Sequence, residues 1–251
     1  MTILAIANQK GGVGKTTTTI NLGAALAALE KRVLLVDCDP QGNASRGVGQ
    51  NAEPPNLYQV MTGEADAADS IRDTGFPNLD LIPADRDLVG VEVEFVGQEN
   101  WHRKLANALA PVADDYDLVL LDCPPSLGHL TLSALSAADG VLVPLQCEYY
   151  ALEGVSELVS TIRRVQGGLN PRLEIAGVLL TMYDDRTNLS KDVADEIRKH
   201  FSGRVYETVI PRNIRLAEAP SHGLSVLQYD IRCRGSEAYL AAAREMLGRA
   251  A

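Results

Sequence analysis

The chain has 251 residues, of which 46% are hydrophobic, and its formal net charge is −10. This hydrophobic content is ample for a buried core, and no apolar run approaches the roughly 18 residues that a membrane-spanning helix needs. The acidic balance excludes a generally basic nucleic-acid binder. The four scattered cysteines form no C-x-x-C pair, which argues against a zinc site or disulfide framework and fits small buried thiols in a reduced, cytoplasmic protein.

Strand-like apolar runs alternate with helical patterns from one end of the chain to the other. In chain order we predict strands over residues 3–7, 33–36, 79–82, 118–121, 141–145, 175–180 and 205–210, and helices over 15–30, 99–110, 127–138, 151–166, 189–201 and 237–247, with a loop rich in Gly, Asn and Pro after residue 36. Continuous apolar strands between helices indicate a parallel sheet covered on both faces. The prediction is therefore one doubly wound, mainly parallel α/β domain spanning residues 1–251.

A glycine-rich loop lies between the first predicted strand and the helix that follows it. Glycines let the backbone curl so that its N–H groups point at phosphate oxygens, and the positive end of the following helix adds to that attraction. We expect Lys15 to reach the β- and γ-phosphates of a nucleoside triphosphate and the Thr16 hydroxyl to ligate Mg²⁺. The predicted nucleotide-binding residues in the loop are Lys10, Gly11, Gly12, Val13, Gly14, Lys15, Thr16 and Thr17.

The loop departs from the common phosphate-binding pattern at its first position. The pattern G-x-x-x-x-G-K-[ST] requires glycine six residues before Lys15, where this sequence has Gln9 followed by a second lysine, Lys10. Two lysines are more than one triphosphate needs, so Lys10 is expected to point away and reach the nucleotide of a facing subunit. The loop resembles the deviant Walker A motif of the ParA/MinD ATPases, in which this lysine works in trans.

Carboxylates follow two of the predicted strands, at the edge of a parallel sheet where ligands bind. Asp37 and Asp39 follow residues 33–36, and Asp122 follows residues 118–121. Asp122 fits the Walker B aspartate that binds Mg²⁺ directly or through water. Asp39 is the candidate for positioning the water that attacks the γ-phosphate and for a place beside the metal, with Asp37 supporting the outer shell of the metal. The predicted catalytic residues are Lys10, Lys15, Asp39 and Asp122, and the predicted metal-site residues are Thr16, Asp39 and Asp122.

Along nearly its whole length the chain resembles the chromosomal-type ParA proteins of the Soj group, which are DNA-segregation ATPases. Besides the phosphate-binding loop, the segments that carry the resemblance are residues 36–43 (VDCDPQGN), 121–126 (LDCPPS), 146–154 (QCEYYALEG) and 209–221 (VIPRNIRLAEAPS). The resemblance implies slow, Mg²⁺-dependent ATP hydrolysis and an ATP-dependent homodimer that binds double-stranded DNA without sequence preference. A ParB-type partner at centromere-like sites would stimulate hydrolysis and release the dimer from the nucleoid, with no membrane involved.

The resemblance also assigns roles to single positions. The positions implied at the dimer interface are Lys10, Glu148, Tyr149 and Glu153. Pro211 and Asn213 would lie near the adenine. For DNA contacts the resemblance points to Arg186 and Arg215, and Arg232 and Arg234 are plausible additions.

The charge distribution is compatible with a local DNA-binding patch on an acidic protein. Residues 186–251 hold 11 lysines and arginines against 8 aspartates and glutamates, whereas residues 1–185 hold 12 against 25. Arginines contact phosphate by charge and paired hydrogen bonds without reading base sequence. The alternative reading is that the basic residues are solvated helix faces and that Arg212 and Arg215 only stabilise their own loop or pair with Glu218.

Three other functions share parts of these patterns. A MinD-like ATPase would use the same loop to cycle on membranes and position protein cargo or division machinery, but residues 237–251 form only one bulky apolar row and fit packing against the core better. A nitrogenase-reductase-like carrier would hold an iron–sulfur cluster through cysteines, whose positions here do not match. A module holding ATP as a fixed ligand is disfavoured by the paired Asp37 and Asp39.

Overall fold

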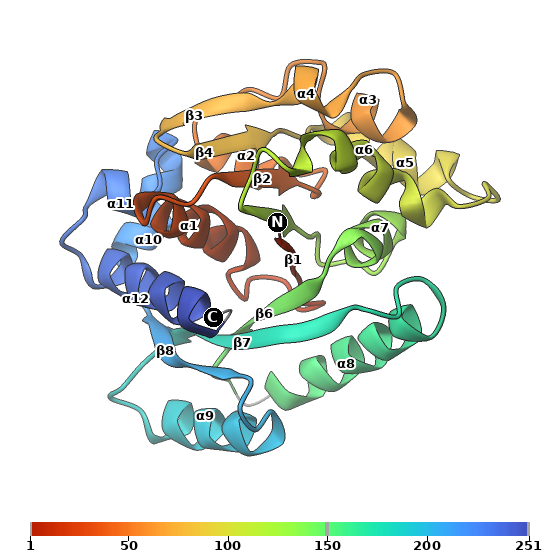
Figure 1. The fold of residues 1–251 in the computed structure, drawn as a ribbon. Coiled ribbons are helices and arrows are strands. Elements are labelled where there is room, and N and C mark those ends of the chain that lie inside the picture. Colours follow the sequence, from red (N-terminus) through yellow and green to blue (C-terminus); the bar gives the residue numbers. More distant parts are fainter. Residues whose placement is uncertain (1, 149–150, 250–251) are drawn as a thin grey trace.

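The computed structural model describes residues 2–148 and 151–249, with the side chains of residues 151–156 left aside. Its centre is an eight-stranded sheet with the order β3-β4-β2-β5-β1-β6-β7-β8 (Figure 1). The strands are β1 (Thr2–Ile6), β2 (Val33–Asp37), β3 (Arg72–Phe76), β4 (Leu79–Ile82), β5 (Leu118–Asp122), β6 (Gly140–Gln146), β7 (Glu174–Tyr183) and β8 (Val205–Pro211). Neighbouring strands pair in parallel except at the edge, where β3 runs antiparallel to β4. The mainly parallel doubly wound fold is confirmed.

Helices cover both faces of the sheet. The α-helices are α1 (Lys15–Ala28), α2 (Asn43–Gly47), α3 (Leu57–Thr62), α4 (Ala67–Ser70), α5 (Gly90–Glu94), α6 (Lys104–Ala113), α7 (His129–Ala137), α8 (Ala151–Gly168), α9 (Asn188–His200), α10 (Ile214–Glu218), α11 (Val226–Tyr229) and α12 (Arg234–Arg249). Short 3₁₀ turns lie at η1 (Arg86–Val89), η2 (Trp101–Arg103) and η3 (Ala219–His222). Helices α1, α2 and α10 to α12 pack on one face, and α3 to α9 pack on the other.

The central strand shows why both faces need cover. In β1, Ile3 and Ala5 contribute to the core beneath α3–α9, while Leu4 and Ile6 contribute to the core beneath α1 and α12. Successive side chains of a strand point to opposite faces, so a continuous apolar run requires an apolar partner on each side. Figure 1 shows α1 and α12 side by side over their face, with α6, α7 and α8 on the other.

The predicted strands and long helices lie within a few residues of their observed bounds, whereas the segment between β2 and β5 is richer than expected. It contains α2 to α5, η1 and the antiparallel strand β3, where we predicted mainly loop. Most of these elements have only four to six residues, too few to display a helical period. The helix expected over residues 99–110 begins later, because Trp101–Arg103 is a 3₁₀ turn before α6.

The sheet order brings the important loops together at one edge. β1 lies between β5 and β6, and β5 lies between β1 and β2. Asp37 of β2 stands opposite Asp122 of β5, and Asp122 stands opposite Ile6 of β1, just before the glycine loop. The carboxyl ends of three adjacent parallel strands therefore place that loop beside both aspartates.

Candidate functional site

The glycine loop that links β1 to α1 is held by hydrogen bonds to neighbouring strands and by its own side chains. The Thr181 hydroxyl of β7 donates to the Val13 carbonyl at 2.8 Å, and the Lys10 N–H donates to Asn8 Oδ1 at 3.1 Å. Gly12 and Gly14 have φ of +75° and +88°, in the left-handed region that glycine adopts without strain. The sequence therefore has glycine at the two positions of the loop where the backbone adopts a left-handed conformation.

The inside of the loop is open and rich in free donors, which fits a bound triphosphate. A Cβ atom placed on Gly11 or Gly12 would meet no heavy atom within 4 Å among the described residues. Helix α1 begins after Gly14 without a side-chain cap, and its first turn holds no acidic residue. The N–H groups of that turn therefore have no side-chain acceptor in the described structure, as expected of an anion-binding helix N-terminus.

Lys15 lies buried at the base of this cradle, with 7% of its surface exposed. Its Nζ atom donates to the Lys10 carbonyl at 3.3 Å, so the ammonium is held inside the loop. Burial lowers the pKa of Lys15, while the nearby charge of Asp122 raises it again. A buried cation balanced by a carboxylate is poised to neutralise phosphate oxygens.

Asp122 is fully buried and held by two hydroxyls of α1. Thr16 Oγ1 donates to Asp122 Oδ2 at 2.8 Å, and Thr19 Oγ1 donates to Asp122 Oδ1 at 3.0 Å. Burial and the charge of Asp37 raise the pKa of Asp122, and the two hydroxyl hydrogen bonds lower it. Thr16 and Asp122, both predicted to lie at the metal, are thus in direct contact, and Thr19 holds the second oxygen of the carboxylate.

The two aspartates after β2 differ in their surroundings. Asp37 is fully buried, and its Oδ2 accepts hydrogen bonds from the Ser45 N–H at 2.8 Å and the Ser45 hydroxyl at 2.7 Å. Burial raises the pKa of Asp37, and the Ser45 hydrogen bonds lower it. Asp39 lies nearer the surface, where its Oδ1 accepts from the Gln41 N–H at 2.9 Å. Asp37 thus braces the loop, and Asp39 is the better placed to meet a ligand.

These residues fit a magnesium ion whose other ligands are phosphate oxygens and water. Among the described residues, no three histidine, cysteine or carboxylate side chains converge to hold a metal by themselves. Mg²⁺ in phosphoryl-transfer sites keeps several waters and takes few protein ligands besides the phosphates. The Thr16 hydroxyl and the Asp122 carboxylate, 2.8 Å apart, supply the hard oxygen atoms such a site needs.

Lys10 points away from its own cradle. Its Nζ atom forms an ion pair with Glu148 Oε2 at 3.0 Å, and both side chains are partly exposed. Lys10 and Glu148, each predicted to lie at the dimer interface, therefore meet at the surface of one subunit. Tyr149 lies outside the described residues, and Glu153 lies in α8 with its side chain outside them.

Pro211 and Asn213 line an apolar hollow of about 400 Å³ beside the loop, as their predicted place near a base requires. Gly14 and Thr17 at the start of α1 and Tyr239 of α12 also line the hollow. The Tyr239 hydroxyl and the Thr18 hydroxyl of α1 lie 3.2 Å apart. A flat apolar slot next to a phosphate cradle is suited to a nucleotide base.

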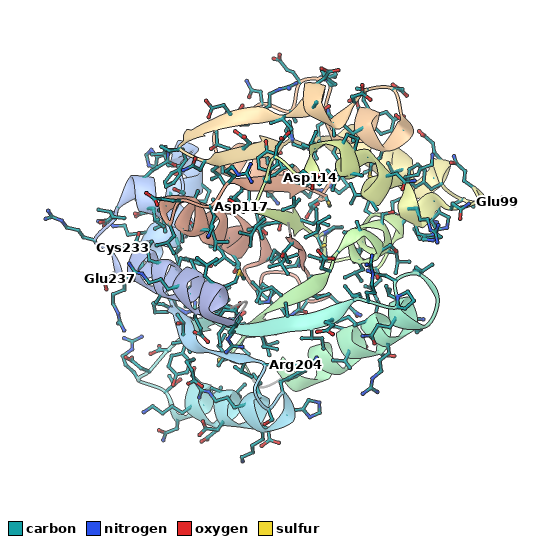
Figure 2. All side chains as sticks on the ribbon, in the orientation of Figure 1. Glu99, Asp114, Asp117, Arg204, Cys233 and Glu237 are labelled. Carbon is teal, nitrogen blue, oxygen red and sulfur yellow. The ribbon has the colours of Figure 1, made fainter. Side chains whose placement is uncertain are left out.

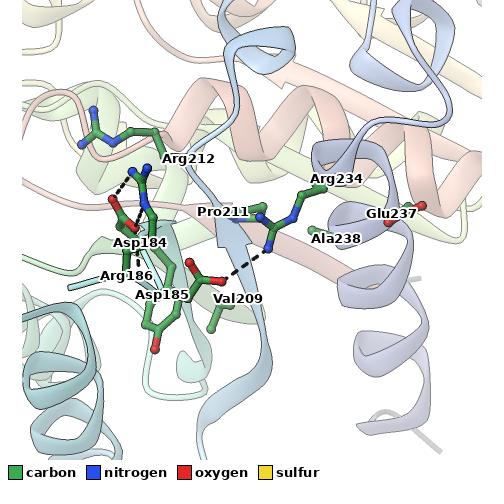
Figure 3. A pocket seen from close by; sticks show the side chains of 10 residues that line it. Asp184, Asp185, Arg186, Val209, Pro211, Arg212, Arg234, Glu237 and Ala238 are labelled. Carbon is green, nitrogen blue, oxygen red and sulfur yellow. Dashed lines mark hydrogen bonds and ion pairs between the residues drawn. The ribbon is translucent and has the colours of Figure 1, made fainter. Parts of the chain in front are cut away.

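Two of the predicted DNA-contacting arginines gather around one open hollow of about 620 Å³ (Figure 3). Arg186 follows β7 and pairs with Asp184 at 2.7 Å, while Arg234 begins α12 and pairs with Asp185 at 3.7 Å. Both guanidinium side chains are more than 70% exposed. Arg212, which sequence reasoning considered only as a loop stabiliser, lines the same hollow.

The other two arginines lie near Asp230. Arg215 forms ion pairs with Glu218 at 2.8 Å and with Asp230 at 3.5 Å. Arg232 is exposed, and its N–H donates to Asp230 Oδ1 at 3.2 Å. The pairing of Arg215 with Glu218 was anticipated as the structural alternative to a DNA contact. All four arginines thus lie in segments that follow β7 or β8, the strands on the far side of β6.

Two residues that support the site escaped sequence reasoning. Thr19 lies one helical turn after Thr16, and this i, i+3 spacing on α1 places both hydroxyls toward Asp122. That spacing was readable from the sequence. Ser45, by contrast, reaches Asp37 because α2 folds back toward β2, and nothing in the local pattern indicates such a return.

The C-terminal helix and the cysteines bear on the alternative functions. Helix α12 buries Tyr239, Ala242, Ala243 and Met246 against the core, as the single apolar row suggested. No helix among the described residues is long and apolar enough to cross a membrane. Cys38 and Cys123 are buried, and burial raises the pKa of both thiols. They are packed, protonated thiols, as predicted for small core residues.

The comparison with known sequences agrees with the geometry. A family model described as an AAA domain matches residues 1–175. The chain is 56% identical over 251 residues to the chromosome partitioning protein ParA of Caulobacter vibrioides, covering 98% of this chain and 94% of the relative. It is 54% identical over 246 residues to the sporulation initiation inhibitor protein Soj of Bacillus subtilis, covering 97% of each chain.

Solved structures show the same fold. Cobyrinic acid a,c-diamide synthase from Mycobacterium smegmatis, with a bound ATP analog and magnesium, superposes with a TM-score of 0.87 at 38% identity over 98% of this chain and 94% of its own. The cell division ATPase MinD of Pyrococcus furiosus superposes with a TM-score of 0.81 at 27% identity over 98% of each chain. With the two-lysine loop, the strand-end aspartates and near full-length identity above 50%, this chain belongs to the ParA/Soj family of chromosome-partitioning ATPases.

Proposed function

We propose that this partitioning ATPase dimerises when it binds ATP and Mg²⁺, that the dimer binds double-stranded DNA without sequence preference, and that a ParB-type partner releases it by stimulating hydrolysis. The observation that carries the proposal is that the side chains of the two loop lysines point in different directions. Lys15 Nζ points into the cradle toward the Lys10 carbonyl, while Lys10 Nζ points out to Glu148. One lysine serves its own nucleotide, and the other is available to a facing subunit.

The lysine that points outward needs little energy to change partners. The Lys10–Glu148 pair is exposed, and exposed ion pairs contribute only about 0–1 kcal/mol. Phosphate offers Lys10 a more highly charged partner in a site that a facing subunit would shield from water. Breaking the pair with Glu148 on dimerisation is therefore an exchange that ATP favours.

Hydrolysis follows from how the chain holds its charges. Lys15 and the backbone N–H groups of the first turn of α1 would hold the phosphates. The Thr16 hydroxyl and the Asp122 carboxylate would hold the metal. Mg²⁺, when bound, neutralises charge on the β- and γ-phosphate oxygens. Asp39 orients the attacking water rather than removing its proton at the start, since a carboxylate is a weak base. Hydrolysis at such a site is slow until a partner completes it, which suits a switch.

DNA binding rests on the arginines that follow β7 and β8. Arg186, Arg215 and Arg234 are each paired with carboxylates at the surface. Such pairs are weak, so DNA phosphates can replace those carboxylates at small cost. A dimer doubles the number of phosphate contacts, which lets the nucleotide state set DNA affinity without new chemistry. Association with the nucleoid follows from this binding.

ATP-dependent dimerisation of the Lys10→Ala variant tests the proposal. We expect the wild-type chain to sediment as a dimer with ATP and Mg²⁺ and as a monomer with ADP, and Lys10→Ala to remain monomeric in both. Lys31→Ala, which removes a lysine from the turn between α1 and β2, is the matched control and should dimerise normally. If Lys10→Ala dimerised at the same ATP concentration as the wild-type chain, a trans role for this lysine would be contradicted.

A further inference from the structure

A short segment after β4 forms an outward-facing apolar row. Val89 ends η1, Val93 lies in α5 and Val96 follows α5, with exposed fractions of 52%, 72% and 67%. The spacing of four and three residues places the three side chains on one face. These are three of six large hydrophobic side chains found exposed among the described residues, and here they cluster within eight positions. Contiguous exposed apolar surface of this kind marks interaction sites.

The opposite face of the same segment is anchored in the core. Leu88, Val91 and Phe95 are each at most 1% exposed and belong to the core beneath α3–α9. The valine row is therefore not a frayed turn that could bury itself by rotating. Any such rotation would bring Leu88, Val91 and Phe95 into water.

One end of the segment contacts the loop that carries Asp37 and Asp39. The Ala84 N–H, two residues before η1, donates to the Ser45 hydroxyl at 3.0 Å, and that hydroxyl donates to Asp37 at 2.7 Å. A Cβ atom on Gly42 would lie 2.6 Å from the Ala84 carbonyl oxygen, so the two backbones touch. Residue 84 and this loop are therefore in direct contact.

The other end contacts the helix that follows Asp122. Glu92 of α5 accepts hydrogen bonds from the N–H groups of His129 at 2.7 Å and Leu130 at 3.1 Å, at the first turn of α7. Gly128 permits this approach, because a Cβ atom there would collide with the Glu92 carboxylate. Residues 84–96 thus contact both the loop that carries Asp39 and the helix that follows Asp122 in the chain.

The charges around the row indicate what covers it. Residues 85–99 hold five carboxylates and one basic residue, Arg86. Asp87, Glu94 and Glu99 are exposed beside the valines, and Figure 2 shows Glu99 at the outer edge of the molecule. A second copy of this chain, with its own net charge of −10, would bring like charges together. A segment with basic and apolar residues in alternation matches both the row and its rim.

We propose that Val89, Val93 and Val96 with their acidic rim are the docking surface for a basic amphipathic segment of the ParB-type partner, and that docking there stimulates hydrolysis by shifting the loop that carries Asp39 and the start of α7. This inference rests on the proposed function and adds where the partner binds and how its binding reaches the site. Glu92 is a positioning residue that links the surface to α7.

The test measures ATP hydrolysis and direct binding with the purified ParB-type protein of the same organism. The Val93→Ser/Val96→Ser variant should keep the basal rate and melting temperature of wild type. Its partner concentration for half-maximal stimulation should rise by about tenfold or more. Leu189→Ser/Ile231→Ser, which removes two exposed apolar side chains elsewhere, is the control and should respond like wild type. Glu92→Gln should bind the partner with unchanged affinity yet reach a several-fold lower stimulated rate.

Each outcome decides between the proposals. Loss of partner response confined to the valine variant supports the docking surface. Equal stimulation of wild type and the valine variant overturns the inference and leaves the proposed function standing. If the partner neither binds nor stimulates wild type, the proposed function falls and the inference with it. If Glu92→Gln reaches the full stimulated rate, the coupling through α7 is wrong.

Discussion

At the scale of single residues, the site gathers three buried carboxyl groups and one buried lysine. Asp37 and Asp122 are fully buried and stand opposite each other in neighbouring strands, with Asp39 close by and Lys15 as the buried cation. Burying carboxylates is costly unless they are hydrogen-bonded or paired. Hydroxyls of Thr16, Thr19 and Ser45 meet part of that cost. A divalent cation would offset more of it, which explains why so acidic a cluster is kept.

The role of Thr19 can be tested with a pair of substitutions. Thr19→Val keeps the shape of the side chain but removes the hydroxyl that donates to Asp122, so the carboxylate loses one of its two restraints. We expect a fall of about 10- to 100-fold in ATP turnover or magnesium affinity, the range typical of lost outer-shell partners. Thr19→Ser retains the hydroxyl and should stay close to wild type. Magnesium titrations of steady-state hydrolysis measure both variants, and equal activity of Val and Ser would contradict the role.

At the scale of elements, α1 is buried on nearly all sides between the sheet and α12. Its Gly23 permits a close approach to side chains of the sheet, because a Cβ atom there would lie 2.7 Å from Leu35 Cδ2 and 3.3 Å from Leu79 Cδ1. Both leucines are at most 1% exposed, so an added methyl group would have to displace side chains within the core. Gly23 therefore allows α1, which begins at the phosphate-binding loop, to pack tightly on the sheet.

Two glycine-to-alanine substitutions in helices should have opposite effects. Gly23→Ala should lower the free energy of unfolding by about 1–3 kcal/mol, since it overpacks a tight interface. Gly167→Ala, in exposed α8 with no heavy atom within 4 Å of its added Cβ among the described residues, should raise it by about 0.5–1 kcal/mol. Urea unfolding of both variants measures the difference. Stabilisation by Gly23→Ala would mean that α1 sits farther from the sheet than described.

The sequence allowed prediction of those elements whose signal is local. Strands such as residues 118–121 are continuous apolar runs, and the turn chemistry of the glycine loop marks the start of α1, so both lie where predicted. The segment from α2 to α5 was missed because its short helices depend on contacts with distant parts of the chain. The hydrogen bonds from Glu92 to the first turn of α7 are of this kind, because they join residues 37 and 38 positions apart. Ser45 is only 8 positions from Asp37, but it reaches that residue because α2 folds back toward β2. Residue roles toward nucleotide and DNA remain predictions.

At the scale of the whole molecule, an acidic protein gathers three arginines, Arg186, Arg212 and Arg234, around one open hollow. Arg186 and Arg234 reach the same hollow from the loop after β7 and the start of α12 (Figure 3). Removing both should reduce the slope of log affinity against log salt by about 1 for each DNA phosphate that is no longer neutralised, and should weaken binding to all DNA sequences alike. Arg163→Ala, which removes an exposed arginine on α8, is the matched control and should leave the slope unchanged. An unchanged slope in the Arg186→Ala/Arg234→Ala variant would place the DNA-binding surface elsewhere.

The central claim is that nucleotide state controls DNA binding, and the most direct test is binding to random-sequence duplex DNA with ATP, with ADP and without nucleotide, across a salt series. The account predicts tight binding with ATP alone, which weakens steeply as salt rises. Absence of DNA binding in every nucleotide state, by protein shown to dimerise on ATP, would contradict it.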